Sequence, residues 1–166
     1  MTTFKGNYPV GKIVPKDDYN TPLCAWKDML QFINKREKLW LPFYNDGSCE
    51  KLLNDLSYNN IIHKNKDFYT YDISDALIID NPPYNKKEKI LEKLLKNTPN
   101  RRISLLLPIG TLERKYLRKY NTNLQVVIPK KKYSFIESGK PAPFMTCWFC
   151  WNLQKELGTT EKLIWI

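Results

Sequence analysis

The stretch Asn81-Pro82-Pro83-Tyr84, which follows an apolar run, brings together residue types that can hold a planar amine. Proline has no N–H and fixes its own φ, and it pushes the residue before it toward extended geometry. The stretch is therefore predicted to be stiff, with a free backbone carbonyl beside the Asn81 side-chain oxygen. Two such acceptors could take both hydrogens of one NH2 group, while Tyr84 stacks on the ring that carries it. This pattern predicts activation of an exocyclic amine, whose lone pair would turn toward an electrophile.

The alternative interpretation is an ordinary turn from a strand into a helix, with Asn81 as the helix cap. The context favours a functional role. The stretch follows a buried-looking strand, Ala76–Asp80, and a second unusual loop, Pro42–Gly47, also comes directly after a short apolar run. Both loops are therefore predicted to lie at the carboxyl ends of strands.

Short apolar runs alternate with amphipathic segments up to about residue 120, and strands alone follow. The expected helices are 23–34, 49–56, 86–97 and 111–120, and the expected strands are 39–42, 61–63, 76–80, 101–110, 124–129, 143–153 and 162–166. This order predicts an α/β fold with a doubly wound, mostly parallel sheet that is closed by an antiparallel hairpin. In such sheets ligands bind outside the carboxyl ends of the strands, where the topology changes direction.

The chain resembles the S-adenosylmethionine-dependent amino-methyltransferases from Asp17 to about Leu153. Their signature is Asp, Asn or Ser, then two prolines, then Tyr, Phe or Trp, and Asn81 to Tyr84 match it at every position. The small phage and viral DNA N6-adenine methyltransferases are the most similar branch. The resemblance implies a Rossmann-like methyltransferase fold and methyl transfer from S-adenosylmethionine to adenine in nucleic acid, with DNA favoured. It implies these catalytic residues: Asn81, Pro82, Pro83 and Tyr84.

Three further segments resemble parts of the cofactor pocket of this family. The segment "DDYNTP" is similar to the motif that holds the methionine end, and "PFYNDGS" to the cofactor loop. The segment "KDFYTY" resembles the one whose Asp-Phe pair contacts the adenine. The resemblance thus implies a set of cofactor-binding residues: Tyr19, Thr21, Pro22, Pro42, Phe43, Asn45, Asp46, Gly47, His63, Asp67, Phe68 and Asn81.

Two positions depart from the family pattern. Asn45 stands where glycine is usual, which leaves Gly47 as the residue that permits close backbone approach. The acid expected at the end of the second strand, which would hold the ribose hydroxyls, is replaced by His63 and Lys64. His63 could hydrogen-bond the ribose, or it could be a strand-end histidine without that role. The alternative function is a catalytically silent methyltransferase-like subunit that binds nucleic acid or activates a partner.

The formal net charge of +10, from 27 basic and 17 acidic side chains, favours a polyanionic partner. Four basic residues, Arg114, Lys115, Arg118 and Lys119, belong to the expected helix 111–120. Basic and aromatic residues are also interleaved in the loop that follows the strand 124–129, a pattern suited to phosphates and exposed bases. Their alternative role is a solvated surface. The residues predicted to bind nucleic acid are Lys130, Lys131, Lys132, Tyr133, Phe135 and Lys140.

A chain of 166 residues is about the size of one domain. Residues 1–16 are expected to be a basic arm, and residues 17–166 a single catalytic domain without a separate target-recognition domain. Such a protein would read a short site or use a specificity or activating subunit. Because a duplex hides the amino nitrogen, the target base would be flipped out or already single-stranded.

No run of about 18 apolar residues is present, and the N-terminal residues lack the apolar region of a secretory signal. An intracellular protein with reduced cysteines and no membrane partner is therefore expected. Cys147 and Cys150 form a C-x-x-C pattern inside an apolar run. Two more ligands at matching spacing are lacking, so the pattern favours core cysteines and no metal site.

Overall fold

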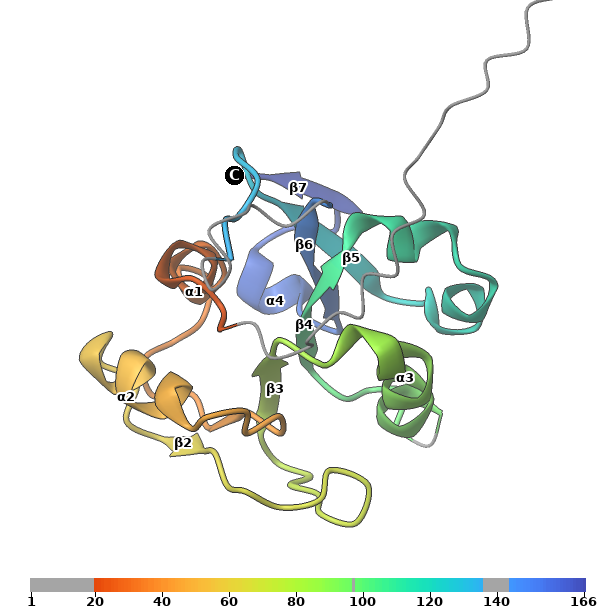
Figure 1. Ribbon diagram of the computed structural model, residues 1–166. Helices are drawn as coiled ribbons and strands as arrows, with labels where there is room; N and C mark the ends of the chain where they lie inside the picture. Colours follow the sequence, from red (N-terminus) through yellow and green to blue (C-terminus); the bar gives the residue numbers. More distant parts are fainter. Residues whose placement is uncertain (1–19, 97, 136–143) are drawn as a thin grey trace, which may run out of the picture.

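The computed structural model describes residues 20–96, 98–135 and 144–166 (Figure 1). The predicted arm 1–16, Tyr19 and Lys140 lie outside these residues. The described strands form one seven-stranded sheet in the order β2-β1-β3-β4-β6-β5-β7. Their bounds are β1 Leu39–Trp40, β2 Ile61–Ile62, β3 Leu77–Asp80, β4 Ile103–Pro108, β5 Leu124–Ile128, β6 Thr146–Trp151 and β7 Leu163–Trp165.

The sheet is mixed, and its antiparallel part is confined to one strand. β6 runs antiparallel to both of its neighbours, β4 and β5. The other neighbouring pairs, β1–β2, β1–β3, β3–β4 and β5–β7, are parallel. The predicted α/β class is confirmed, and so is the antiparallel pairing of the strands on either side of the basic loop.

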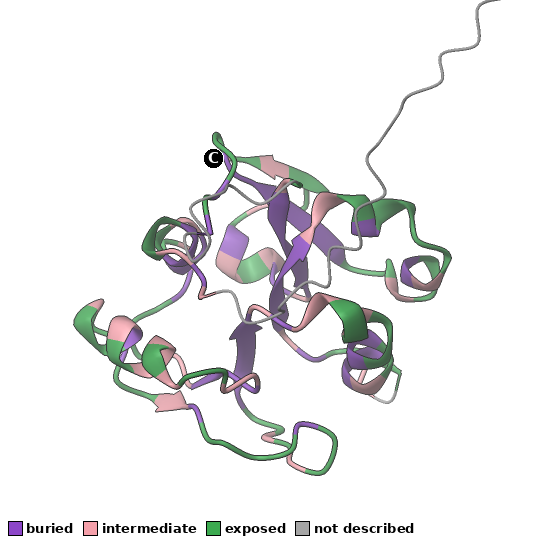
Figure 2. Ribbon diagram, in the orientation of Figure 1, coloured by how far each residue is buried: buried purple, intermediate pink, exposed green. Residues whose placement is uncertain are grey.

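Two apolar cores cover the two faces of the sheet. Successive side chains of a strand point to opposite faces, so Leu77 and Ile79 of β3 pack in one core and Ile78 packs in the other. Figure 2 shows the buried strands in purple between more exposed helices. The described helices are α1 Leu23–Leu30, α2 Ser48–Asp55, α3 Lys87–Leu95 and α4 Gln154–Leu157, with 3-10 helices η1 Tyr84–Lys86, η2 Ile109–Glu113 and η3 Lys115–Tyr120.

The helices divide between the two faces. Trp26 and Met29 of α1 and Leu157 of α4 belong to the core that contains Leu77. Leu91 of α3 and Leu117 of η3 belong to the opposite core. The sheet is therefore covered by helices on both sides, as Figure 1 shows.

The prediction of an α-helix over residues 111–120 was wrong. The segment forms η2 and η3 instead, and Arg114 between them has extended backbone, with φ -73° and ψ 132°. The pairs Arg114–Arg118 and Lys115–Lys119 would place like charges one turn apart in an α-helix, which destabilises it. The expected helix 23–34 ends at Leu30, and α4 and η1 were not expected.

Strand β6 contains both cysteines of the C-x-x-C pattern and places them on opposite faces of the sheet. Cys147 packs in the core that contains Leu91, and Cys150 packs in the core that contains Trp26. Residues three apart in a strand point to opposite faces, so these two sulfurs cannot bind one metal ion. The longest described helix, α3, has nine residues, and no described helix is long and apolar enough to cross a membrane.

Candidate active site

The order of the strands reverses between β1 and β3. β2 follows β1 along the chain and lies on one side of it, whereas β3 lies on its other side. Ligands of open α/β sheets bind at the carboxyl ends of the strands at such a point. The chain leaves β1 through the loop Pro42–Gly47 and leaves β3 through Asn81–Tyr84. Topology therefore brings together the two loops that the sequence singled out.

Other segments reach the same edge of the sheet. β4 and β5 point in the same direction as β3, whereas β6 points the opposite way. The carboxyl ends of β4 and β5 and the amino end of β6 therefore lie along this edge. η2 follows β4, Lys130–Lys132 follow β5, and Phe144 precedes β6. The basic loop therefore begins on the side of the sheet where the two loops meet.

Asp80, the last residue of β3, links these two loops. It is only 2% exposed. Its carboxylate accepts a hydrogen bond from the backbone N–H of Phe43 at 2.7 Å and another from the backbone N–H of Asn81 at 2.8 Å. Burial raises the pKa of Asp80 to about 8, although both N–H groups act to lower it. Sequence reasoning missed this residue, yet an acid at the end of an otherwise apolar run was a visible signal.

The loop Pro42–Gly47 depends on its glycine. Gly47 has φ +79°, and a Cβ added there would lie 2.6 Å from the Tyr44 hydroxyl oxygen. Both the left-handed backbone and the close approach of Tyr44 therefore require glycine. Asn45 also has positive φ, 47°, a conformation that Asn tolerates better than most residues. The departure at this position is thus compatible with a tight loop.

Polar side chains join the N-terminal segment to this loop. Asn20 donates to the Asp46 carboxylate at 3.1 Å, and Asn45 donates to the Asn20 side-chain oxygen at 3.0 Å. Asp46 also accepts from the Ser48 hydroxyl at 2.6 Å, which holds the pKa of Asp46 below its ordinary value. Thr21 is buried and Pro22 directly precedes α1. The segments expected at the methionine end and in the cofactor loop therefore lie side by side.

Phe68 lies against the same loop. Its ring centre is 4.9 Å from that of Phe43 and 6.4 Å from that of Trp40 at the end of β1. Asp67 is exposed, and its carboxylate accepts from the backbone N–H of Tyr69 at 2.9 Å, which shapes the turn. The aromatic member of the predicted adenine-binding pair thus joins the site, while the acidic member faces solvent beside it.

His63 follows β2 and is buried, with 5% of its surface exposed. Its ring packs on Tyr44 with centres 4.9 Å apart, and neither ring nitrogen has a hydrogen-bond partner among the described residues. Burial lowers its pKa, against the opposing effects of the Phe43 backbone and the Glu50 carboxylate. A neutral imidazole therefore lies beside the loop at the position where the resemblance led us to expect an acid.

The ridge Asn81–Tyr84 has the extended form expected from its prolines. Pro83 has φ -61° and ψ 120°, and its carbonyl accepts from the backbone N–H of Lys86 at 3.1 Å. The Pro83 carbonyl is therefore not the acceptor that the ridge would offer to an amine. Tyr84 lies edge-on to Phe144, with ring centres 5.8 Å apart and planes at 63°.

The predicted nucleic-acid residues divide into two groups. Lys130, Lys131 and Lys132 are exposed. Tyr133 and Phe135 are each 4% exposed and belong to the core against α1, and the Tyr133 hydroxyl donates to Asp28 at 2.8 Å. The expectation that these two rings stack on bases is therefore corrected, because both rings are buried in this core. The expected basic helix has become η2 and η3, and its Arg and Lys side chains are exposed.

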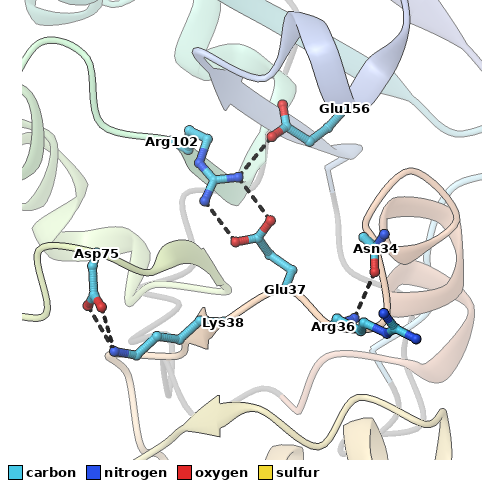
Figure 3. A network of polar contacts seen from close by, with 7 residues as sticks. All are labelled: Asn34, Arg36, Glu37, Lys38, Asp75, Arg102 and Glu156. Atoms are coloured by element: carbon cyan, nitrogen blue, oxygen red, sulfur yellow. Dashed lines mark hydrogen bonds and ion pairs between the residues drawn. The ribbon is translucent and has the colours of Figure 1, made fainter.

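A cavity of about 520 Å³ lies at the opposite end of the sheet, where Glu37 and Arg102 precede β1 and β4. Figure 3 shows the Arg102 guanidinium between two carboxylates: it donates to Glu37 at 2.7 and 3.0 Å and to Glu156 at 2.9 Å. The one cation is shared by two anions, and it ties the segments before β1 and β4 to helix α4. The cavity holds none of the residues that the sequence singled out, and its position is away from the point where the strand order reverses.

Within the described residues, no group of three or more His, Cys, Asp or Glu side chains is placed to hold a metal ion. The features gathered at the carboxyl edge are the stretch Asn81–Tyr84, a glycine-dependent loop, aromatic rings and the buried carboxylate of Asp80. In the comparisons with known proteins, neither a family model nor a curated protein nor a solved structure matches the chain.

Proposed function

We propose that the protein transfers a methyl group from S-adenosylmethionine to the exocyclic amino group of adenine in nucleic acid, with DNA as the favoured substrate. The corresponding fold is a Rossmann-like methyltransferase domain. One observation carries the proposal: Pro42–Gly47 and Asn81–Tyr84 meet at the reversal of strand order and are joined through Asp80. A donor molecule in the first loop would lie next to an amine on the second.

The residues around the first loop suit an adenosine-containing cofactor. Phe43 and Phe68 form an aromatic surface for a purine. His63 is a buried imidazole whose nitrogens could bind ribose hydroxyls. Thr21 and Pro22 lie in the segment that Asn20 fastens to the loop, and they would adjoin the methionine end. These residues would hold the cofactor, and a bound S-adenosylmethionine would supply an electrophilic methyl group.

The ridge would act on the amine. The Asn81 side-chain oxygen and a backbone carbonyl would accept both N–H groups, and the lone pair would then be aimed at the methyl carbon. The new N–C bond would form as the S–C bond of the bound cofactor breaks, and the nitrogen would then release its proton to water. No general base is required at the start, because the amine becomes acidic only after it carries the methyl group. Acceptors aimed at this developing positive charge lower the barrier.

Nucleic acid is the favoured substrate because exposed cations follow a strand that ends at this edge. Lys130–Lys132 are exposed directly after β5, and the exposed Arg114, Lys115, Arg118 and Lys119 lie in the connection that crosses from β4 to the amino end of β5. Together with the net charge of +10, these side chains suit a phosphate backbone. Tyr84 would provide the stacking surface for the target base, as Tyr133 and Phe135 are buried.

A second candidate function is a catalytically silent subunit that binds nucleic acid or activates a partner. One observation favours it: the Tyr44 ring occupies the space beside Gly47 and packs on His63. A cofactor at that position would have to displace this ring. The second candidate therefore predicts nucleic-acid binding without cofactor binding.

Two measurements separate the candidates. Isothermal titration with S-adenosylmethionine and its demethylated product tests the pocket, and Phe68→Ala, which removes part of the aromatic surface, should weaken the binding. Tritiated methyl transfer to an oligonucleotide pool, followed by mass analysis of the nucleosides, tests the reaction. Asn81→Ala should lower turnover by on the order of a hundredfold, whereas the exposed neighbour Asn85→Ala should leave it unchanged. Absence of binding at millimolar ligand would favour the silent subunit.

A further inference from the structure

The position of Asp80 is energetically costly. A buried carboxylate loses its hydration, and proteins normally compensate the loss with a cation or with hydrogen bonds. Among the described ion pairs, none includes Asp80. Its compensation comes from two backbone N–H groups, those of Phe43 and Asn81. An apolar residue would fill the end of β3 at lower cost, so packing does not explain the acid.

The two donors belong to different parts of the site. Phe43 lies in the loop after β1, and Asn81 begins the ridge after β3. β1 and β3 are parallel neighbours that pair at Leu39–Leu77 and Trp40–Ile78, so Phe43 and Asn81 lie beyond this pairing. Each oxygen of Asp80 takes one of the two N–H groups, so the carboxylate fixes the separation between the loop and the ridge.

We propose that Asp80 is a positioning residue whose ionised carboxylate holds the loop of Phe43 and the ridge of Asn81 in the alignment needed for methyl transfer. This inference rests on the proposed function, since it concerns the donor and acceptor halves of the same site. Alignment matters because a displacement of about 1 Å between reacting groups can reduce the rate on the order of a hundredfold.

The protonation state of Asp80 should control this alignment. The ionised carboxylate accepts with both oxygens, whereas the protonated group turns one oxygen into a donor and weakens one of the two bonds. Burial raises the pKa of Asp80 to about 8, so the change falls in an accessible pH range. The thiol of Cys49 on α2 faces the charge of Asp80 and that of Asp46, and burial raises the pKa of this thiol to about 12. Cys49 therefore stays neutral while Asp80 titrates.

The first experiment requires no activity. Amide proton and nitrogen shifts of Phe43 and Asn81 are followed by NMR in the wild-type protein from pH 6 to 9.5. Both amide protons should move downfield with one common midpoint near pH 8, because a charged acceptor strengthens both hydrogen bonds. In Asp80→Asn neither should titrate, since the amide oxygen accepts from only one donor and carries no charge. Separate midpoints, or titration that persists in Asp80→Asn, would refute the proposal that the Asp80 carboxylate holds both segments.

The second experiment tests how the charge of Asp80 affects the rate of methyl transfer. The wild-type kcat for methyl transfer should rise with pH and level off above about pH 8. Asp80→Asn should lower kcat by about tenfold to a hundredfold, with a smaller change in KM, and its pH profile should lose the rise. Equal kcat and an unchanged profile in Asp80→Asn would refute the positioning role while the proposed function stands. Common titration of the two amides without any methyl transfer by the wild type would refute the proposed function instead.

Discussion

The ammonium group of Lys93 lies 4.3 Å from the centre of the Phe68 ring, and it also donates hydrogen bonds to the carbonyl oxygens of Phe68 and Tyr71. Lys93 belongs to α3, the helix that follows the acceptor ridge. Arg101 acts on the same loop, since it donates to the Ile73 carbonyl and pairs with Asp72 at 2.7 Å. Two cations therefore fasten a loop that has no strand or helix of its own to hold its carbonyl groups.

Replacing Lys93 with Met should loosen this loop and the Phe68 ring. The expected result is about tenfold weaker binding of the demethylated cofactor, because a loop that must be ordered on binding reduces affinity. Calorimetric titration measures the affinity, and hydrogen exchange of residues 67–71 measures the loop. Lys89→Met, an exposed residue of the same helix, is the control and should match the wild type. Faster exchange in both variants would contradict a specific role of Lys93.

Tyr84 should contribute mainly through its ring. Tyr84→Ala should weaken oligonucleotide binding by about 1 to 3 kcal/mol, the usual worth of one base stacked on an aromatic side chain. Tyr84→Phe should remain near the wild type, because the ring is preserved. Fluorescence anisotropy with a labelled oligonucleotide measures both. If Tyr84→Phe lost as much affinity as Tyr84→Ala, the hydroxyl rather than stacking would be responsible.

The exposed lysines after β5 should bind phosphates without regard to sequence. Changing Lys130, Lys131 and Lys132 to Glu should weaken binding to all duplexes alike and flatten the dependence of log K on log salt, by about 0.9 for each phosphate that the protein no longer neutralises. The control carries three Glu at exposed lysines of other elements, Lys27, Lys51 and Lys155, and it has the same net charge. An equal loss of affinity in both triple variants would mean that only the overall charge matters.

Arg102 should be a stability residue at the opposite edge. Arg102→Met leaves the half-buried Glu37 and Glu156 without their donor, and we expect a loss of about 2 kcal/mol in the free energy of unfolding. Denaturant titration measures it. Lys38→Met, which breaks the more exposed pair with Asp75, should change stability little.

The same ion cluster predicts a pH dependence. The hydrogen bond from Arg102 lowers the pKa of Glu37, so its contribution is present above the ordinary carboxyl pKa and is lost as the pH falls through the lowered value. The difference in unfolding free energy between wild type and Arg102→Met should therefore shrink below about pH 4. A difference that stays constant down to pH 2 would contradict the charged pairing.

The burial of His63 predicts that the free energy of unfolding depends on pH near neutrality. Because burial lowers its pKa, the unfolded chain binds a proton more readily than the folded protein does. The neutral His63 side chain therefore costs no stability above about pH 6.5. Below that value the free energy of unfolding falls, because the unfolded chain gains a proton that the folded protein does not. The free energy of unfolding should thus fall more steeply from pH 7 to 5 in the wild type than in His63→Gln. Parallel curves would mean that folding leaves the pKa of His63 unchanged.

Local sequence determined the features that depend on neighbouring residues. The run Ala76–Asp80, apolar up to its last residue, predicts a strand, because a short apolar run bounded by turn residues is typical of a buried strand. The two prolines after it predict an extended turn. The amphipathic pattern near residues 86–97 predicts α3 with small errors at its ends. Alternation of such elements indicates an α/β sheet, so the approximate place of the ridge followed from the sequence.

Tertiary structure decided what depends on distant contacts. Tyr133 looked like a surface aromatic among lysines, yet it donates to Asp28, 105 residues earlier in the chain. Asp80 is tied to Phe43 across 37 residues, and neither residue indicates this bond by its type. The insertion of β6 between β4 and β5 is likewise set by which faces can be buried together. The free energy of such burial depends on which two elements pack against each other. The local sequence pattern of one element therefore cannot predict its partner.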